Sequence, residues 1–309
     1  MFLTPEFPRR LTLELTNACN LRCAMCPSRL RPELAKGLME PSLFRRIVDQ
    51  AAEHRPVALV PFFRGEPLMH PQVLELLDHA KRRGLGPVQL VTNGLLLDEG
   101  LARGLLDLGL DFISFSLDSV RPEEYAQIRQ GGDFSMAMAN VARFMDYRGR
   151  GGYATEVQVS ATRTGLNQES ISQFIAYWQS RADRTRIYYE HSGDGHTGSL
   201  DCPEVPRDME RRPCHKLFED MVVYFDGGVA LCNHDWYRAP VLGDLNAASV
   251  AQVWLGPAYQ GLRRQHLHPQ ELQDGTCRHC DHWKISYLDK PYVGELYTPT
   301  WEARRAHQA

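Results

Sequence analysis

Apolar residues in the first two-thirds of the chain alternate between short strand-like runs and longer amphipathic, helix-like stretches. Strand-like runs occur at residues 11–16, 57–63, 88–92, 112–117, 153–162 and 186–190. Helix-like stretches lie between them, at residues 41–54, 71–83, 99–108, 136–147 and 168–180. Because strand–helix alternation produces a parallel sheet covered by helices, the pattern predicts an α/β fold. Six such units fit a partial (β/α)6 TIM barrel.

The alternation stops near residue 200. Residues 201–213 are rich in proline and charge and are expected to form a linker. Two apolar runs, 221–224 and 229–231, flank Asp226-Gly227-Gly228, which is a strong hairpin signal, and Ser249 is a candidate N-cap for a following helix. We therefore expect a barrel domain at 1–200, a small α+β domain at 214–290 and a tail at 291–309.

Composition and charge limit the classes of protein to which the chain can belong. The chain is 43% hydrophobic and 24% charged, as in ordinary globular proteins. Its net charge is −3 and it has no long basic block, which argues against nucleic-acid binding. Without a membrane-length apolar run or a signal-peptide core, we expect a cytoplasmic protein with no membrane partner. In that compartment, its eight cysteines favour metal ligation or reactive thiols over disulfides.

Three cysteines directly after the first predicted strand have a distinctive spacing. Cys19, Cys23 and Cys26 form a C-x3-C-x2-C pattern. Three thiolates on one loop can ligate three irons of a four-iron cluster, which leaves the fourth iron open to a small chelating molecule. The alternatives are chance spacing or zinc, although structural zinc sites usually present four ligands with paired C-x2-C units.

Polar residues also follow the next three predicted strands. Glu66 follows the second strand, Asn93 follows the third, and Ser116 and Asp118 lie at the end of the fourth. Because chemistry in such a barrel belongs at the carboxyl ends of the strands, we expect these residues near the cysteines. Considered singly, Glu66 could be solvated in a turn, Asn93 could serve only a turn, and Asp118 could cap a helix.

Together these motifs resemble the radical SAM superfamily. In this chain Arg64 replaces the first glycine of the G-G-E-P motif, while Ser116-Leu117-Asp118 and Tyr125-x-x-Ile128-Arg129 are retained. The resemblance implies that the first cluster binds S-adenosylmethionine (SAM), whose reductive cleavage gives a 5′-deoxyadenosyl radical. It implies metal ligation by Cys19, Cys23 and Cys26, and cofactor contacts by Glu66, Asn93, Ser116, Asp118 and Arg129.

A second set of cysteines lies in the small domain. Cys214, Cys232, Cys277 and Cys280 could complete a four-Cys site, and zinc is an alternative because two of them form a C-x2-C pair. The flanking residues, such as Leu242-Gly243-Asp244-Leu245, resemble SPASM/twitch domains. The resemblance implies the shorter twitch form with one auxiliary 4Fe-4S cluster, and thus two 4Fe-4S clusters per chain. The spacing is similar to that of twitch dehydrogenases acting on aminocyclitols.

Three further residues are candidates on the substrate side. Glu190 and His196 lie at the end of the sixth predicted strand and in the loop after it, where a carboxylate or imidazole could remove a substrate proton. An ordinary solvated loop is the alternative. Cys202 could be a packed structural thiol, an additional cluster ligand, or a hydrogen-atom donor to a substrate radical, as in radical SAM epimerases.

The resemblance implies a radical SAM oxidoreductase. In the leading interpretation it oxidises a small polar alcohol, such as a sugar or aminocyclitol, and the auxiliary cluster accepts an electron. Because the chain begins shortly before its first predicted strand, we expect no N-terminal peptide-recognition domain. A reducing protein such as flavodoxin or ferredoxin is an expected partner. The rival hypotheses are epimerisation, modification of a peptide (RiPP), and a non-catalytic iron–sulfur or zinc scaffold.

Overall fold

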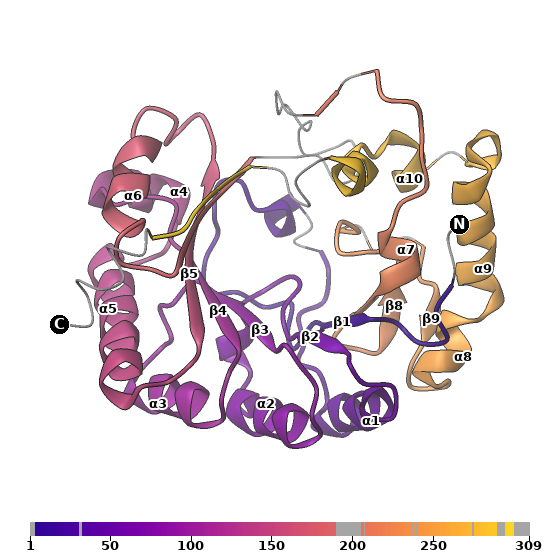
Figure 1. The fold of residues 1–309 in the computed structure, drawn as a ribbon, viewed down its shortest axis with the longest axis horizontal. Helices are drawn as coiled ribbons and strands as arrows, with labels where there is room; N and C mark the ends of the chain where they lie inside the picture. The colour runs from indigo at the N-terminus through magenta and orange to yellow at the C-terminus, as the bar shows by residue number, and fades with distance from the viewer. Residues whose placement is uncertain are drawn as a thin grey trace.

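The computed structural model describes residues 4–30, 33–189, 205–206, 208–236, 238, 240–273, 275–288 and 294–299. The six parallel strands of the barrel are divided between two five-stranded sheets, which follow one another along a curve (Figure 1). They are β1 (Arg10–Leu13), β2 (Ala58–Val60), β3 (Gln89–Thr92), β4 (Phe112–Ser116), β5 (Glu156–Arg163) and β6 (Arg184–Tyr189). A single parallel bridge between Leu59 and Val88 joins the β1–β2 pair to the β3–β6 strands. The predicted partial barrel is confirmed.

Helices cover the outer face of this sheet (Figure 1). They are α1 (Pro41–Ala52), α2 (Val73–Arg82), α3 (Glu99–Asp107), α4 (Pro122–Ile128), α5 (Phe134–Gly151) and α6 (Ile171–Trp178). Two short 3-10 turns, η1 (Pro27–Leu30) and η2 (Pro67–Met69), belong to the loops that follow β1 and β2. Each predicted helix is present, with ends shifted by a few residues. Helix α4 was not predicted, because its seven residues are too short for a clear apolar period.

The two faces of the sheet differ in chemistry. Because successive strand residues point to opposite faces, Ile113, Phe115, Val157 and Val159 share one face and belong to the hydrophobic core. The alternate residues line the opposite, inner face of β4, β5 and β6. We call five of them the inner wall: Ser114, Gln158, Ser160, Arg186 and Tyr188.

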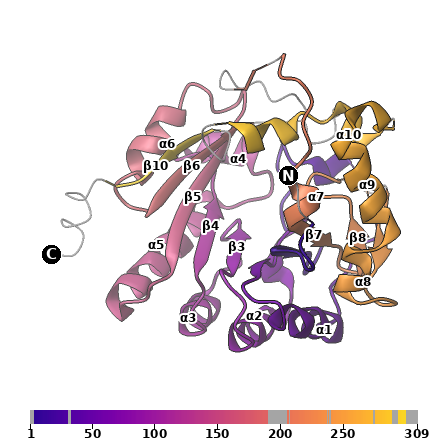
Figure 2. The ribbon, with the colours of Figure 1, turned by 45° about the vertical axis from the view of Figure 1, so that its right-hand side comes forward.

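The C-terminal region extends the barrel edge (Figure 2). It contains α7 (Lys216–Glu219), β7 (Asp220–Val223), β8 (Gly228–Ala230), β9 (Gly243–Asp244), α8 (Val250–Trp254), α9 (Pro257–Leu267), η3 (Pro269–Glu271), α10 (Thr276–His279) and η4 (His282–Tyr287). Strand β7 pairs in parallel with β1 and antiparallel with β8, which confirms the hairpin. Ser249 caps α8 through a capping box with Gln252, as predicted.

The described part of the tail forms a strand, β10 (Glu295–Tyr297). It pairs antiparallel with β6, so that Leu296 lies opposite Arg186. The sequence predicted only a tail here, because its apolar run is too short to indicate a paired strand. None of the helices in the described part of the chain has the length and apolar character needed to cross a lipid bilayer.

Candidate cluster and cofactor sites

The loop after β1, residues 18–26, holds the first three cysteines, and we call it the cysteine loop. Its backbone is fastened to the end of α4: the N–H of Arg22 donates to the carbonyl of Gln130 at 2.9 Å, and that of Ala24 to the carbonyl of Ile128 at 2.8 Å. These bonds fix the loop at the carboxyl ends of the strands. Its cysteines differ in exposure, with Cys19 exposed, Cys26 partly buried and Cys23 buried.

Glu66 is buried between the ends of β2 and β3. One carboxylate oxygen accepts hydrogen bonds from the Thr92 hydroxyl at 2.6 Å and the Leu68 N–H at 3.2 Å, and the other accepts from the Asn93 N–H at 2.9 Å. Burial raises the pKa of Glu66, while the three donors oppose that rise. The carboxylate therefore ties two strand ends together, in addition to any contact with a cofactor.

Asn93 connects this junction to the cysteine loop. Its side-chain N–H donates to the side-chain oxygen of Asn20 at 2.8 Å, and its own oxygen accepts from the Leu95 N–H at 3.0 Å. The side-chain amide thus positions the segment between Cys19 and Cys23. Sequence reasoning could not find Asn20 as its partner, because the two lie 73 residues apart.

Gly65 packs directly against the cysteine loop. Its φ is +86°, and a Cβ there would lie 2.5 Å from the carbonyl oxygens of Thr16 and Ala18. Both backbone conformation and space therefore require glycine at this position.

We expect Gly65→Ala to displace the cysteine loop and reduce the iron bound after reconstitution. The clash with two backbone carbonyls should add to the left-handed strain of about 1–2 kcal/mol. Gly109→Ala is the control, because Gly109 also has a positive φ, of 72°, but no atom within 4 Å of its Cβ position. Denaturant unfolding and iron analysis measure both effects. Equal losses for the two variants would contradict the packing argument.

Asp118 and Arg129 form a buried ion pair. Arg129 Nε donates to one oxygen of Asp118 at 2.5 Å, and the other oxygen accepts from the Thr162 N–H at 2.7 Å. Arg129 also extends Nη1 toward the Sγ of Cys23, at 3.6 Å. Asp118 thus joins β5 to the end of α4, which corrects the helix-cap alternative. Ser116, the last residue of β4, is half-buried nearby.

A buried network links the barrel to the C-terminal region. Arg64 is 3% exposed and donates through Nε (2.7 Å) and Nη2 (3.1 Å) to both oxygens of Glu14, which is fully buried. The guanidinium lies 4.5 Å from the ring centroid of Tyr224, whose hydroxyl donates to Asp235 at 2.8 Å. Asp235 is three residues after Cys232. Sequence reasoning missed this network because it treated Arg64 only as a replacement for glycine.

Glu14→Ala should lower the free energy of unfolding by about 3–5 kcal/mol, because it leaves the Arg64 charge buried without its partner. Glu99→Ala is the control: it removes an ion pair with Arg103 on the exposed face of α3 and should change stability little. Denaturant titration measures both. A loss for Glu14→Ala as small as that of the control would contradict the argument.

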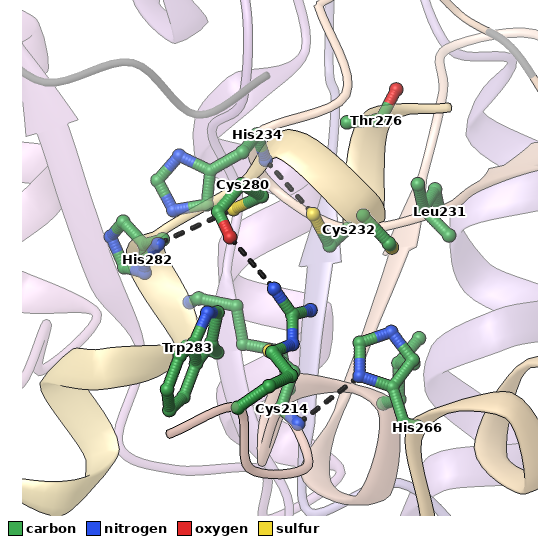
Figure 3. Close-up of a pocket in the computed structure, with 13 residues that line it drawn as sticks. Cys214, Leu231, Cys232, His234, His266, Thr276, Cys280, His282 and Trp283 are labelled. Carbon is green, nitrogen blue, oxygen red and sulfur yellow. Dashed lines mark hydrogen bonds between the residues drawn. The ribbon is translucent and has the colours of Figure 1, made fainter. Parts of the chain in front are cut away.

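The second set of cysteines surrounds one pocket in the C-terminal region (Figure 3). Cys214 precedes α7, Cys232 follows β8, Cys277 belongs to α10 and Cys280 follows it. The N–H two residues after Cys232 donates to its Sγ at 3.3 Å, and the N–H two residues after Cys280 does the same at 3.4 Å. Four separated thiols and two backbone donors to sulfur thus share this pocket.

The pocket favours neutral thiols unless a cation is bound. Burial is the main cause that raises the pKa of Cys277 to about 12 and that of Cys280 to about 11. Burial and, to a smaller extent, Arg211 lower the pKa of His266 to about 4, so the imidazole is neutral and its Nδ1 accepts the Cys214 N–H at 3.3 Å. Because cluster ligation needs thiolates, the donor set fits a bound iron–sulfur cluster.

A single metal ion would need a more compact group of ligands. In the residues that the structure describes, no three His, Cys, Asp or Glu side chains are placed to hold one ion.

The remaining predicted site residues, Glu190, His196 and Cys202, lie outside the described residues.

Comparisons with known proteins place the chain in a family. The radical SAM superfamily profile matches residues 13–176, and SPASM, an iron–sulfur cluster-binding domain, matches residues 214–281. A cofactor-modifying protein for the tungsten-containing aldehyde ferredoxin oxidoreductase of Pyrococcus furiosus is 30% identical over 90% of both chains. A probable GTP 3′,8-cyclase of Methanococcus maripaludis is 32% identical over 45% of this chain and 46% of that protein. The chain thus spans about half the length of this relative.

Two solved structures share the fold. BtrN in complex with AdoMet and 2-DOIA is 17% identical, with a TM-score of 0.61 over 94% of this chain and all of BtrN. Streptococcus suis SuiB bound to its precursor peptide SuiA is 14% identical, with a TM-score of 0.67 over 97% of this chain and 77% of SuiB. At these identities the likeness concerns the fold. The two matching domains imply SAM and two iron–sulfur clusters as cofactors, and the chain belongs to the radical SAM superfamily as an enzyme with a SPASM domain.

Proposed function

We propose that this enzyme oxidises a small polar alcohol, of the sugar or aminocyclitol class, to a carbonyl compound. The inner wall is the observation that carries this proposal. Barrel interiors are usually filled by branched apolar side chains, whereas here hydroxyl, amide, guanidinium and phenol groups line the inner face of β4, β5 and β6. Such a wall suits a substrate rich in hydroxyl and amino groups.

Gln158 lies at the centre of the inner wall. Its side-chain N–H group donates to Ser114 Oγ at 2.9 Å and to the Tyr188 hydroxyl at 3.4 Å, and Ser114 Oγ lies 3.4 Å from Ser160 Oγ. Tyr188 is 41% exposed, so one end of the wall is open to solvent. These groups can exchange their mutual hydrogen bonds for bonds to substrate hydroxyls with little net loss.

The proposed ligand sets divide the chemistry between two places. Cys19, Cys23 and Cys26 would hold the SAM-binding cluster, and the four pocket cysteines would hold the auxiliary cluster. When bound, SAM and the first cluster supply hydrogen abstraction, and the second cluster supplies an electron acceptor. Four thiolates would leave that second cluster no open position for substrate, which supports an electron-transfer role.

The remaining roles belong to side chains of the chain itself. We propose that Glu66, Asn93, Ser116 and Asp118 position SAM, directly or through the strand ends that they hold. Glu190 or His196 would take the proton from the substrate hydroxyl. A reducing protein such as flavodoxin or ferredoxin would deliver the electron that starts each turnover.

The test uses the full chain, reconstituted anaerobically and supplied with SAM, a reductant and a panel of sugars and aminocyclitols that includes 2-DOIA. We expect one carbonyl product, lacking two hydrogen atoms, for each 5′-deoxyadenosine formed. Gln158→Leu should weaken oxidation about tenfold or more, because it leaves inner-wall polar groups without a partner. Gln173→Leu, on the exposed face of α6, is the matched control. Product without oxidation would reject the dehydrogenase.

The second candidate is a redox-neutral epimerisation or a peptide modification. The likeness to SuiB bound to its precursor peptide supports only the peptide modification. In an epimerase, Cys202 would return a hydrogen atom to the substrate radical. Cys202→Ala would then still form 5′-deoxyadenosine but lose product, and the wild-type product would carry solvent deuterium on carbon. A dehydrogenase needs no such donor, so its Cys202→Ala variant should retain product formation.

A further inference from the structure

Arg129 is placed against a thiol of the cysteine loop. Its Nη1 lies 3.6 Å from the Sγ of Cys23, within the distance of a hydrogen bond to sulfur. The Arg129 side chain is 12% exposed and Cys23 is buried, so little solvent screens the contact. The resemblance implied that Arg129 contacts SAM, whereas this contact directs its charge to a candidate cluster ligand.

Asp118 determines the position of Arg129. One of its oxygens receives Arg129 Nε and the other receives the Thr162 N–H, while its backbone carbonyl accepts from the Asn167 side chain at 3.0 Å. Its φ of 64° is left-handed, which is uncommon for a residue other than glycine and is maintained here by these bonds. These bonds fix the position of the guanidinium.

We propose that Arg129 raises the reduction potential of the SAM-binding cluster through a charge-assisted hydrogen bond to the Cys23 thiolate, with Asp118 as its positioning residue. Reduction adds one electron to the cluster and its thiolates, and a nearby fixed cation stabilises that added charge. Hydrogen bonds to cluster sulfurs and groups around the ligands tune such potentials in general. The proposal requires only that Cys23 ligates the first cluster. It does not depend on the identity of the substrate.

The test is a redox titration, monitored by EPR, of the fully reconstituted protein without SAM. Arg129→Gln should reduce the equilibrium constant for reduction of the first cluster about tenfold, which is about 59 mV for one electron. Arg129→Lys, which keeps the charge, should show a smaller shift. The auxiliary cluster is the internal reference and should not move. Arg103→Gln, at an exposed ion pair of α3, is the control and should leave both potentials unchanged.

A second measurement has a decisive arm that uses the wild-type protein alone. In wild-type protein labelled with guanidino-15N arginine, pulsed EPR of the reduced first cluster should show a 15N coupling, and Arg129→Lys should lose it. Arg22, the other arginine near these cysteines, has an exposed side chain, so we expect the 15N coupling to come from Arg129. An unchanged potential in Arg129→Gln with weakened SAM binding, or no 15N coupling in wild type, would overturn the proposal and favour a SAM contact instead.

Discussion

Replacing Cys19, Cys23 and Cys26 together with alanine is expected to remove about half of the bound iron and to abolish SAM cleavage. Two clusters with separate thiolate sets should each carry about four irons, so loss of one set leaves the other. The second set lies in a pocket lined by residues of α7, of α10 and of the segment after β8, and no residue of the cysteine loop lines it. Iron analysis and chromatography of 5′-deoxyadenosine measure the two outcomes.

The control for this variant is Arg22→Ala, which changes an exposed side chain of the same loop and should keep all the iron and the cleavage activity. SAM cleavage in the triple variant would mean that these cysteines do not hold the SAM-binding cluster. Loss of all the iron would mean that the second site does not assemble independently of the first.

The fold could be predicted from sequence because its signals are local. The strand at 88–92 is observed as β3, and the hairpin at Asp226-Gly227-Gly228 joins β7 to β8. Each follows from a short apolar run bounded by turn residues, which needs no knowledge of distant parts of the chain. The parallel pairing of β1 with β7 could not be found in this way, because residues 10–13 pair with residues 220–223.

The candidate site likewise combines features that are local in sequence with features that are not. The C-x3-C-x2-C spacing at residues 19–26 and the C-x2-C pair at 277–280 are local and could be read directly. The surroundings of these cysteines depend on partners far apart in sequence. Glu14 meets Arg64 across 50 residues, and Arg129 meets Cys23 across 106. The one available signal was chemical: an arginine at a position that usually holds glycine, Arg64, required a buried anion nearby. Glu14, which follows β1 directly, is that anion in the structure, but the sequence did not single it out.

Cys277→Ala combined with Cys280→Ala is expected to preserve SAM cleavage but to stop substrate oxidation. The double change removes two of the four thiols that line the auxiliary pocket, and the remaining two cannot hold a cubane cluster. The cysteine loop and its contacts with α4 and β3 are untouched, so the first cluster should still assemble. Iron content should therefore fall by about half, as in the triple variant, but with the opposite functional result.

The expected loss of oxidised product is at least about a hundredfold, because changes to groups merely surrounding metal ligands already cost 10–100-fold. His279→Ala is the matched control, since it alters an exposed residue of α10 between the same two cysteines. A dehydrogenase must pass one electron from the substrate radical to an acceptor, and without the auxiliary cluster 5′-deoxyadenosine should accumulate with no carbonyl product. Full oxidation by the double variant would show that the auxiliary cluster is not the electron acceptor. Loss of SAM cleavage as well would show that the two sites depend on each other. The Arg64–Tyr224–Asp235 network would then be the physical connection between them.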